Sequence, residues 1–198
     1  MIIRGVRQFG RPRGTAGRLA GRVMAHRTSN RRRNRWVVSL LDVRPTDRVL
    51  EIGFGPGIAL AELTARVTSG RVYGIDHSEV MLRQAARRNA AAIRAGRLEL
   101  RQAPVEALPD FGRPLDVVLA VNSLGFWPDP DDALTALRAR LRPGGRIALA
   151  SQPRTPGATT ASAARQLQDL LDRAGFTQLR VRTLPLRPPV ACVLAVNG

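Results

Sequence analysis

The feature that most constrains the fold is a regular alternation between short apolar runs and segments with helical spacing. Apolar runs of strand length occupy residues 48–52, 71–75, 98–102, 115–121 and 146–151. Helical patterns lie between most of these runs, and such an alternation predicts a mostly parallel sheet with helices on both faces. The run over 115–121, LDVVLAV, is unbroken, which is typical of a strand covered on both sides.

Helices are predicted over four ranges that follow these strands. The ranges are 57–67, 78–95, 131–141 and 159–174. The last two strand-like runs, 176–184 and 190–196, are joined by a proline-rich turn without a helix, so they must pair antiparallel. The predicted fold class is therefore α/β: three layers, with a doubly wound, mostly parallel sheet of seven strands and a C-terminal antiparallel hairpin.

The first 41 residues differ from the rest of the chain in charge. All 32 basic residues are arginine, and eleven of them lie in residues 1–41, which contain no Asp or Glu. We predict a flexible Arg-rich tail over 1–18, a helical segment over 19–41 and the main domain over 42–198. No apolar run reaches the roughly 18 residues of a membrane span, and the single Cys192 excludes an internal disulfide. A soluble, cytoplasmic protein is expected.

A glycine-rich loop follows the first strand in the stretch VLEIGFGPG, residues 49–57. Three glycines in five positions weaken a strand and indicate a close approach to the main chain. The dinucleotide fingerprint G-x-G-x-x-G fails here, because Ile58 or Leu60 stands where the third glycine belongs. The observed spacing suits a smaller ligand that lies along the backbone and carries an ammonium group for a nearby carboxylate.

An acidic residue ends the second strand, in the stretch VYGID that closes on Asp76. A carboxylate at this position can accept hydrogen bonds from both hydroxyls of a ribose. In open α/β sheets, ligands bind beyond the carboxyl ends of the strands, where the strand order reverses. The loop and Asp76 together therefore predict a nucleoside-bearing cofactor, either a dinucleotide or S-adenosylmethionine, and the loop spacing favours the second.

The stretches VLEIGFGPG, YGID, EALP and LRPGG, in this order and spacing, resemble the class I S-adenosylmethionine-dependent methyltransferases, in the small-molecule branch often called type 11. The resemblance covers about residues 34–151. It implies a Rossmann-like methyltransferase fold, S-adenosylmethionine as cofactor, S-adenosylhomocysteine as product and no metal. It does not identify the substrate.

The resemblance also implies roles for individual residues. Gly53, Gly55 and Gly57 let the methionine part of the cofactor lie against the backbone, and Glu51 anchors its ammonium directly or through water. Asp76 holds the ribose. The other implied cofactor contacts are His77, Met81, Val105, Glu106 and Asn122. Family members usually carry an Asp before the Ala-Glu of the third-strand loop; the stretch QAPVE lacks it, so adenine recognition is expected to fall to the main chain at Val105 and Glu106.

Methyl transfer from an activated sulfonium requires an aligned nucleophile and the exclusion of water, and orientation alone supplies about 7–11 kcal/mol. The sequence shows no dedicated base. Asn122, which would orient a substrate oxygen or hold its loop, and His26 are the candidate catalytic residues. Phe126 and Trp127 are expected either to wall an apolar or aromatic substrate or to pack in the core. The acceptor, an O, N or C nucleophile of a small molecule, is not specified.

The helical segment over 19–41 is the expected lid of the cofactor site. Only residues 152–158 separate the fifth strand from the last helix, which leaves no room for an inserted cap. A cover formed by the head would exclude water and gate turnover. The lid residues expected nearest the site are Met24, His26, Arg27, Asn30 and Asn34.

The basic head also supports alternative functions. Eleven arginines without an acid favour RNA binding, as in an RNA-modifying methyltransferase, although only Phe9 and Trp36 are available there to stack bases. An anionic membrane surface is a second possible partner for this charge. A pseudoenzyme that binds cofactor without turnover is a third alternative, which the intact loop and Asp76 oppose. The sequence does not indicate an oligomeric state.

Overall fold

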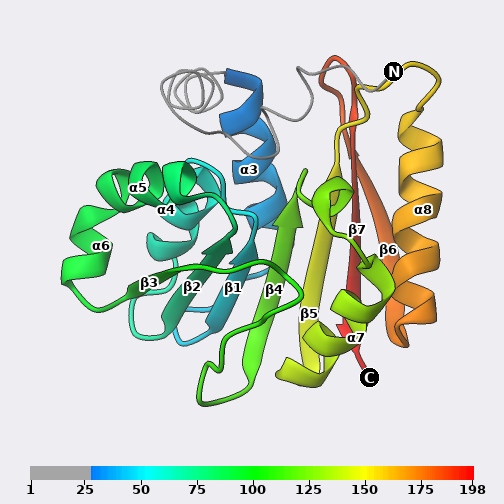
Figure 1. Ribbon diagram of the computed structural model, residues 1–198. Helices are drawn as coiled ribbons and strands as arrows, with labels where there is room; N and C mark the ends of the chain where they lie inside the picture. The colour runs from blue at the N-terminus through cyan, green and yellow to red at the C-terminus, as the bar shows by residue number, and fades with distance from the viewer. Residues whose placement is uncertain (1–27) are drawn as a thin grey trace.

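The computed structural model of the chain describes residues 28–198 (Figure 1). The predicted tail over 1–18 and the first part of the predicted lid lie outside the described residues. The same holds for Met24, His26 and Arg27.

A seven-stranded sheet in the order β3-β2-β1-β4-β5-β7-β6 runs through the described part of the chain. The first five strands in this order are mutually parallel, and β7 is antiparallel to both β5 and β6. The strands are β1 Arg48–Ile52, β2 Arg71–Asp76, β3 Leu98–Gln102, β4 Leu115–Val121, β5 Leu141–Ser151, β6 Phe176–Leu184 and β7 Val190–Asn197. This arrangement confirms the predicted α/β fold with its C-terminal antiparallel hairpin.

Helices connect the strands and cover both faces of the sheet. They are α3 Thr28–Leu40, α4 Ile58–Thr64, α5 Glu79–Arg88, α6 Ala90–Arg94, α7 Pro130–Arg140 and α8 Thr160–Arg173, with a short 3₁₀ helix, η1, at Leu124–Phe126. Alternate strand residues divide the core: Leu50 and Ile147 pack toward α7 and α8 in one cluster, whereas Val49 and Val117 pack toward α3, α4 and α5 in another.

Most element ends lie within one to three residues of the sequence prediction, and two elements differ by more. The single helix expected over 78–95 is divided at Asn89, whose side-chain Nδ2 donates hydrogen bonds to the carbonyl oxygens of Ala85 and Gly57 at 2.9 and 3.1 Å. The fifth strand begins at Leu141 instead of residue 146, and its pairing with β4 shifts register between Leu115 and Val117.

The strand order reverses between β1 and β4, since the chain moves outward from β1 to β3 and then returns to the other side of β1. In Figure 1, α3 stands beside the ends toward which the arrows of β1 and β4 point. The second half of α3 is a core element, because Val37 and Val38 are buried in the cluster beneath it. Its first half, with Asn30 and Asn34, faces the edge of the sheet where a ligand is expected. Among residues 28–198, no helix combines the length and the apolar character that a bilayer crossing requires.

Candidate active site

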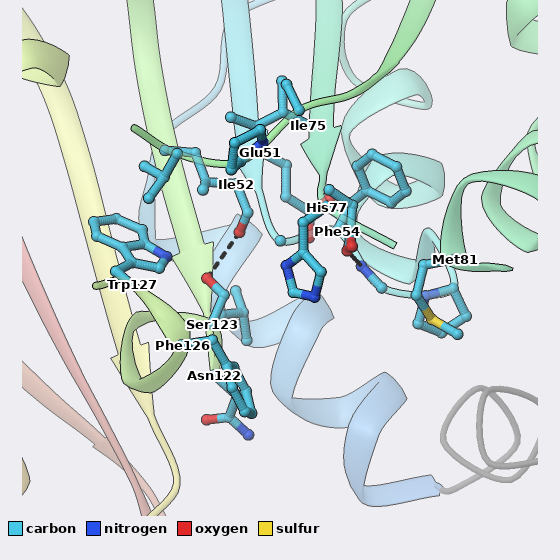
Figure 2. A pocket seen from close by; sticks show the side chains of 18 of the residues that line it. Glu51, Ile52, Phe54, Ile75, His77, Met81, Asn122, Ser123, Phe126 and Trp127 are labelled. Atoms are coloured by element: carbon cyan, nitrogen blue, oxygen red, sulfur yellow. Dashed lines mark hydrogen bonds between the residues drawn. The ribbon is translucent and has the colours of Figure 1, made fainter. Parts of the chain in front are cut away.

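A pocket lies at the carboxyl ends of β1, β2 and β4, with further walls from α3 and from the segments after β3 and β4 (Figure 2). Its lining includes most of the residues expected at the site: Asn30, Asn34, Glu51, Gly53, Gly55, Asp76, His77, Met81, Val105, Glu106, Asn122, Phe126 and Trp127. Gly57 is not among the lining residues. The other expected residues, Met24, His26 and Arg27, lie outside the described part of the chain.

The three glycines of the loop serve different purposes. A Cβ at Gly53 would lie 2.4 Å from the Cβ of Ser123, whose hydroxyl donates a 2.9 Å hydrogen bond to the carbonyl of Ile52 (Figure 2). A Cβ at Gly57 would lie 2.8 Å from the Cβ of Ala85 on α5. Both positions are therefore kept bare by the packing of the protein itself. Only Gly55, with a φ of 53°, faces open space within the pocket.

Asp76 ties the glycine loop to the end of β2. Its side chain is 6% exposed, and its two oxygens accept hydrogen bonds from the backbone N–H groups of Gly55 at 2.8 Å and Ser78 at 2.9 Å. Burial raises the pKa of Asp76, whereas these two hydrogen bonds and the neighbouring His77 oppose the rise. Each carboxylate oxygen keeps a second lone pair, so Asp76 can still accept hydrogen bonds from a ligand.

Glu51 is the second buried carboxyl of the pocket. It is 2% exposed, and its Oε2 has no hydrogen-bond partner within residues 28–198. Burial raises the pKa of Glu51 well above its usual range, the carboxyl of Asp76 raises it further, and a hydrogen bond from the backbone of Leu60 opposes both. Neither acid forms an ion pair with a described residue. We call Glu51 and Asp76 the acidic end of the pocket; its charge calls for a cationic ligand group.

Asn122 follows β4 and holds the neighbouring strand end. Its φ is 57°, its backbone N–H donates to the carbonyl of Ala150 at 2.8 Å, and its side-chain oxygen accepts a 2.7 Å hydrogen bond from the backbone N–H of Gln152. Of the two roles expected for Asn122, the structure therefore shows this side-chain oxygen holding the loop.

Arg33 is a pocket residue that the sequence analysis missed. It is only 6% exposed, although it is the third of three consecutive arginines on a strongly basic helix. Its Nη1 donates a 2.6 Å hydrogen bond to Oε1 of Gln152, and its Nη2 donates to the side-chain oxygen of Asn30. The available signal was helical spacing, since Arg33 lies four residues before the buried Val37 and therefore on the same face of α3.

Among residues 28–198, no carboxylate forms an ion pair with the buried Arg33. Burial and, to a smaller extent, the positive charge of Arg154 together lower the pKa of Arg33 to about 10. Arg154 donates a 2.9 Å hydrogen bond to the same Gln152 oxygen that Arg33 uses. We call Arg33, together with Arg154 and Gln152 beside it, the basic end of the pocket; of the three, only Arg33 is a lining residue.

Two aromatic residues follow β4 on the pocket wall. Trp127 is buried within the hydrophobic cluster that also contains Leu134 of α7, so it is a packing residue as well as a lining residue. Phe126 is 45% exposed and is the only large exposed apolar side chain in residues 28–198. Of the two, only Phe126 offers an accessible aromatic face to a ligand.

Comparison with known proteins agrees with this geometry. A family profile described as "Methyltransferase domain" matches residues 49–145. The chain is 31% identical over 176 residues to the uncharacterized methyltransferase YdaC of Bacillus subtilis (strain 168), covering 87% of this chain and 94% of that protein. It is 36% identical over 150 residues to a trans-aconitate 2-methyltransferase of Pseudomonas aeruginosa, covering 73% of this chain but half of that protein.

Solved structures show the same architecture. The crystal structure of a SAM dependent methyltransferase from Aquifex aeolicus superposes with a TM-score of 0.70 at 19% identity, over 90% of this chain and 98% of that one. The fold is thus that of a Rossmann-like methyltransferase. Given the family profile and the relative YdaC, the chain belongs to the class I S-adenosylmethionine-dependent methyltransferases, which confirms the resemblance in the sequence.

Proposed function

We propose that the protein transfers the methyl group of S-adenosylmethionine to a small organic molecule and releases S-adenosylhomocysteine. The acidic end of the pocket carries this proposal. Two buried carboxyls without a cationic partner in the described chain lie beside the open backbone at Gly55. A ligand with an ammonium group and a ribose meets both requirements. The family supplies the class of reaction, and the relative named for trans-aconitate supports a small-molecule acceptor.

The pocket residues fit the cofactor in the following way. Glu51 would hold the ammonium of the methionine part, Asp76 would accept the ribose hydroxyls, and Gly55 would leave room for the ligand at the main chain. Met81 and Val105 are buried apolar lining residues suited to the faces of the adenine. The remaining lining positions near this end are His77 and Glu106.

S-adenosylmethionine, when bound, supplies a methyl group that is already activated by its sulfonium. The protein then contributes orientation, worth about 7–11 kcal/mol of barrier reduction in well-aligned systems, and the exclusion of water. Asn122 positions the loop after β4 through its hydrogen bond to Gln152. The first turns of α3, with Asn30 and Asn34, form part of the cover over the pocket. The acceptor atom is an O, N or C nucleophile held against Phe126.

The test is calorimetric binding of S-adenosylhomocysteine. We expect saturable binding to the full chain, and Asp76→Ala should weaken it about tenfold to a hundredfold, because hydrogen bonds to a charged group contribute about 1.5–3 kcal/mol each. Asp172→Ala, which removes an exposed carboxylate on α8, is the matched control and should leave the affinity unchanged. Nicotinamide dinucleotides should not bind. Absence of S-adenosylhomocysteine binding, or equal losses in the two variants, would contradict the proposal.

A further inference from the structure

We propose that the basic end of the pocket binds a carboxylate of the methyl acceptor, so that the substrate is a small organic acid. Arg33, which lines the pocket, would supply the buried guanidinium, and the exposed Arg154 a second one bonded to the same Gln152 oxygen. This inference rests on the proposed function, because it assigns the substrate class of the same pocket.

Arg33 carries a buried charge without an ion-pair partner in the described chain. An arginine stays protonated in a protein, and a buried charge is strongly unfavourable unless an opposite charge compensates it. No ion pair within residues 28–198 includes Arg33. Residues 1–27 contain no Asp or Glu, so they have no side-chain carboxylate to offer. An anionic ligand group that reaches Arg33 would therefore supply the ion pair that the described chain does not form.

Arg33 also has an unsatisfied hydrogen-bond donor. The Nε of Arg33 is buried and has no hydrogen-bond partner among the described residues, although the residue lines the pocket. The two terminal nitrogens already donate to Gln152 and Asn30, which fixes the plane of the guanidinium. A planar guanidinium with a donor to spare matches the geometry of a carboxylate.

Two positive charges, those of Arg33 and Arg154, meet at Gln152. Arg33 and Arg154 donate to the same oxygen of Gln152, at 2.6 and 2.9 Å, and the other end of that amide donates to the carbonyl of Pro188 at 2.7 Å. A neutral amide that accepts from two guanidinium groups leaves them repelling each other, and this repulsion adds to burial in lowering the pKa of Arg33. An anion placed between them would remove this repulsion.

The position of the basic end favours the acceptor over the cofactor. Asp76 ends β2, whereas Gln152 follows β5, and in the sheet order β2-β1-β4-β5 these two strand ends lie on opposite sides of β1 and β4. A cofactor with its ribose at Asp76 and its ammonium at Glu51 occupies the ends of β2 and β1. The part of the pocket lined by Arg33, Asn122 and Phe126 remains for the molecule that receives the methyl group.

The experiment compares Arg33→Gln with Arg32→Gln, the same substitution at the preceding, exposed position of α3. Succinate, benzoate and trans-aconitate are titrated into each protein, with and without saturating S-adenosylhomocysteine. Trimethyl trans-aconitate and inorganic phosphate serve as the neutral and non-carboxylate probes. We expect at least one acid, and neither of these probes, to bind. Arg33→Gln should weaken that binding about tenfold to a hundredfold, as for a charged hydrogen bond, and Arg32→Gln should not change it.

Separate titrations test whether Arg33 binds the carboxylate of the cofactor instead of the carboxylate of the acceptor. S-adenosylhomocysteine and 5′-methylthioadenosine, which lacks the amino-acid part, are titrated into Arg33→Gln. Unchanged affinity for both supports the proposal. A selective loss for S-adenosylhomocysteine would show that Arg33 holds the carboxylate of the cofactor, and would overturn it. Binding of phosphate but of no acid, or of no anion at all, would also overturn it.

Failure of the proposed function gives a different result, because S-adenosylhomocysteine would then not bind. The acid titrations without S-adenosylhomocysteine would still show whether the basic end binds a carboxylate. If Arg33→Gln does not fold, as judged by its thermal transition, Arg154→Gln replaces it. Arg154 is exposed, so this variant keeps the core intact and should weaken acid binding severalfold. Unchanged acid affinity in Arg154→Gln would contradict the assigned pair.

Discussion

The acidic and basic ends of the pocket consist of groups of opposite charge, and neither end forms an ion pair within the described chain. They are assembled differently. Glu51 and Asp76 stand at the ends of the paired strands β1 and β2, so the parallel sheet brings them together directly. Arg33 comes from α3 and reaches Gln152, which lies 119 residues further along the chain. The acidic end therefore depends on local sheet geometry, and the basic end depends on how α3 packs.

The two ends also differ in how they tolerate burial. A buried carboxyl with a raised pKa can take up a proton and lose its charge as the pH falls. A guanidinium whose pKa is lowered only to about 10 remains charged throughout the neutral range. The acidic end should thus respond to pH, whereas the basic end should keep its charge and respond to anions. A substitution at one end, or in the region between the two ends, therefore leaves the other end as an internal reference.

The largest expected effect disrupts the loop that supports the acidic end. Gly53→Ala should lower the free energy of unfolding by about 3 kcal/mol or more, because a left-handed residue and a clash with Ser123 add together. Gly55→Ala is the matched control, with a similar φ but open space around its Cβ, and should lose about 1 kcal/mol. Urea denaturation measures both.

Gly55→Ala should lose more affinity for S-adenosylhomocysteine than Gly53→Ala, which is the reverse of the order expected for their losses of stability. Because Gly55 borders open pocket space, an added methyl group there should reduce the affinity for S-adenosylhomocysteine in a protein that remains folded. Equal losses of stability in the two variants would show that the contact with Ser123 does not require glycine at position 53.

The next effect concerns the pH dependence of the acidic end. A cationic ligand group favours ionised Glu51 and lowers the raised pKa of this carboxyl, so binding should release a proton. Affinity for S-adenosylhomocysteine should therefore fall as the pH falls through that raised pKa. Glu51→Gln should flatten the profile and, at pH 8, reduce the affinity about tenfold. Calorimetry in two buffers of different ionisation enthalpy measures the released proton.

The stability of the free protein should also depend on the ionisation of Glu51. A carboxyl whose folded-state pKa is raised destabilises the folded state progressively as the pH rises from its unfolded value of about 4.3 through the raised value. The stability of Glu51→Gln relative to the natural sequence should therefore improve between pH 5 and pH 8. Arg33→Gln should show no such trend, and a trend in it would remove the contrast between the two ends.

The acidic end illustrates what the sequence makes accessible. Strand-like runs and a glycine loop predicted which strand ends converge, Asp76 followed from its place at the end of β2, and Glu51 came from the resemblance to the family. In a parallel α/β sheet the carboxyl ends of neighbouring strands lie at one edge, which brings these two carboxyls close together. The glycines were harder to interpret, since a bare position looks the same in sequence whether a ligand or Ser123 approaches it.

The basic end shows where sequence reasoning stops. Arg33 is one of eleven arginines in the head, and only the packing of α3 onto the sheet distinguishes it from its exposed neighbours. Gln152 stands in a connecting segment without a motif. The division of the helix at Asn89 escaped prediction for a similar reason, because a tertiary hydrogen bond to Gly57 overrides an alanine-rich pattern.

The smallest expected effect tests the wall between the two ends. Phe126→Ala should change the free energy of unfolding by less than about 0.5 kcal/mol, because the side chain is 45% exposed. It should weaken benzoate binding about threefold to tenfold, the range for a lost aromatic contact, and leave succinate binding unchanged. Phe126→Leu keeps an apolar wall and should recover part of the loss. If succinate and benzoate weaken equally, Phe126 supports the basic end through the fold of the loop. If only benzoate weakens, the ring contacts the apolar part of the acid while Arg33 holds its carboxylate, and the two ends act on different parts of one substrate.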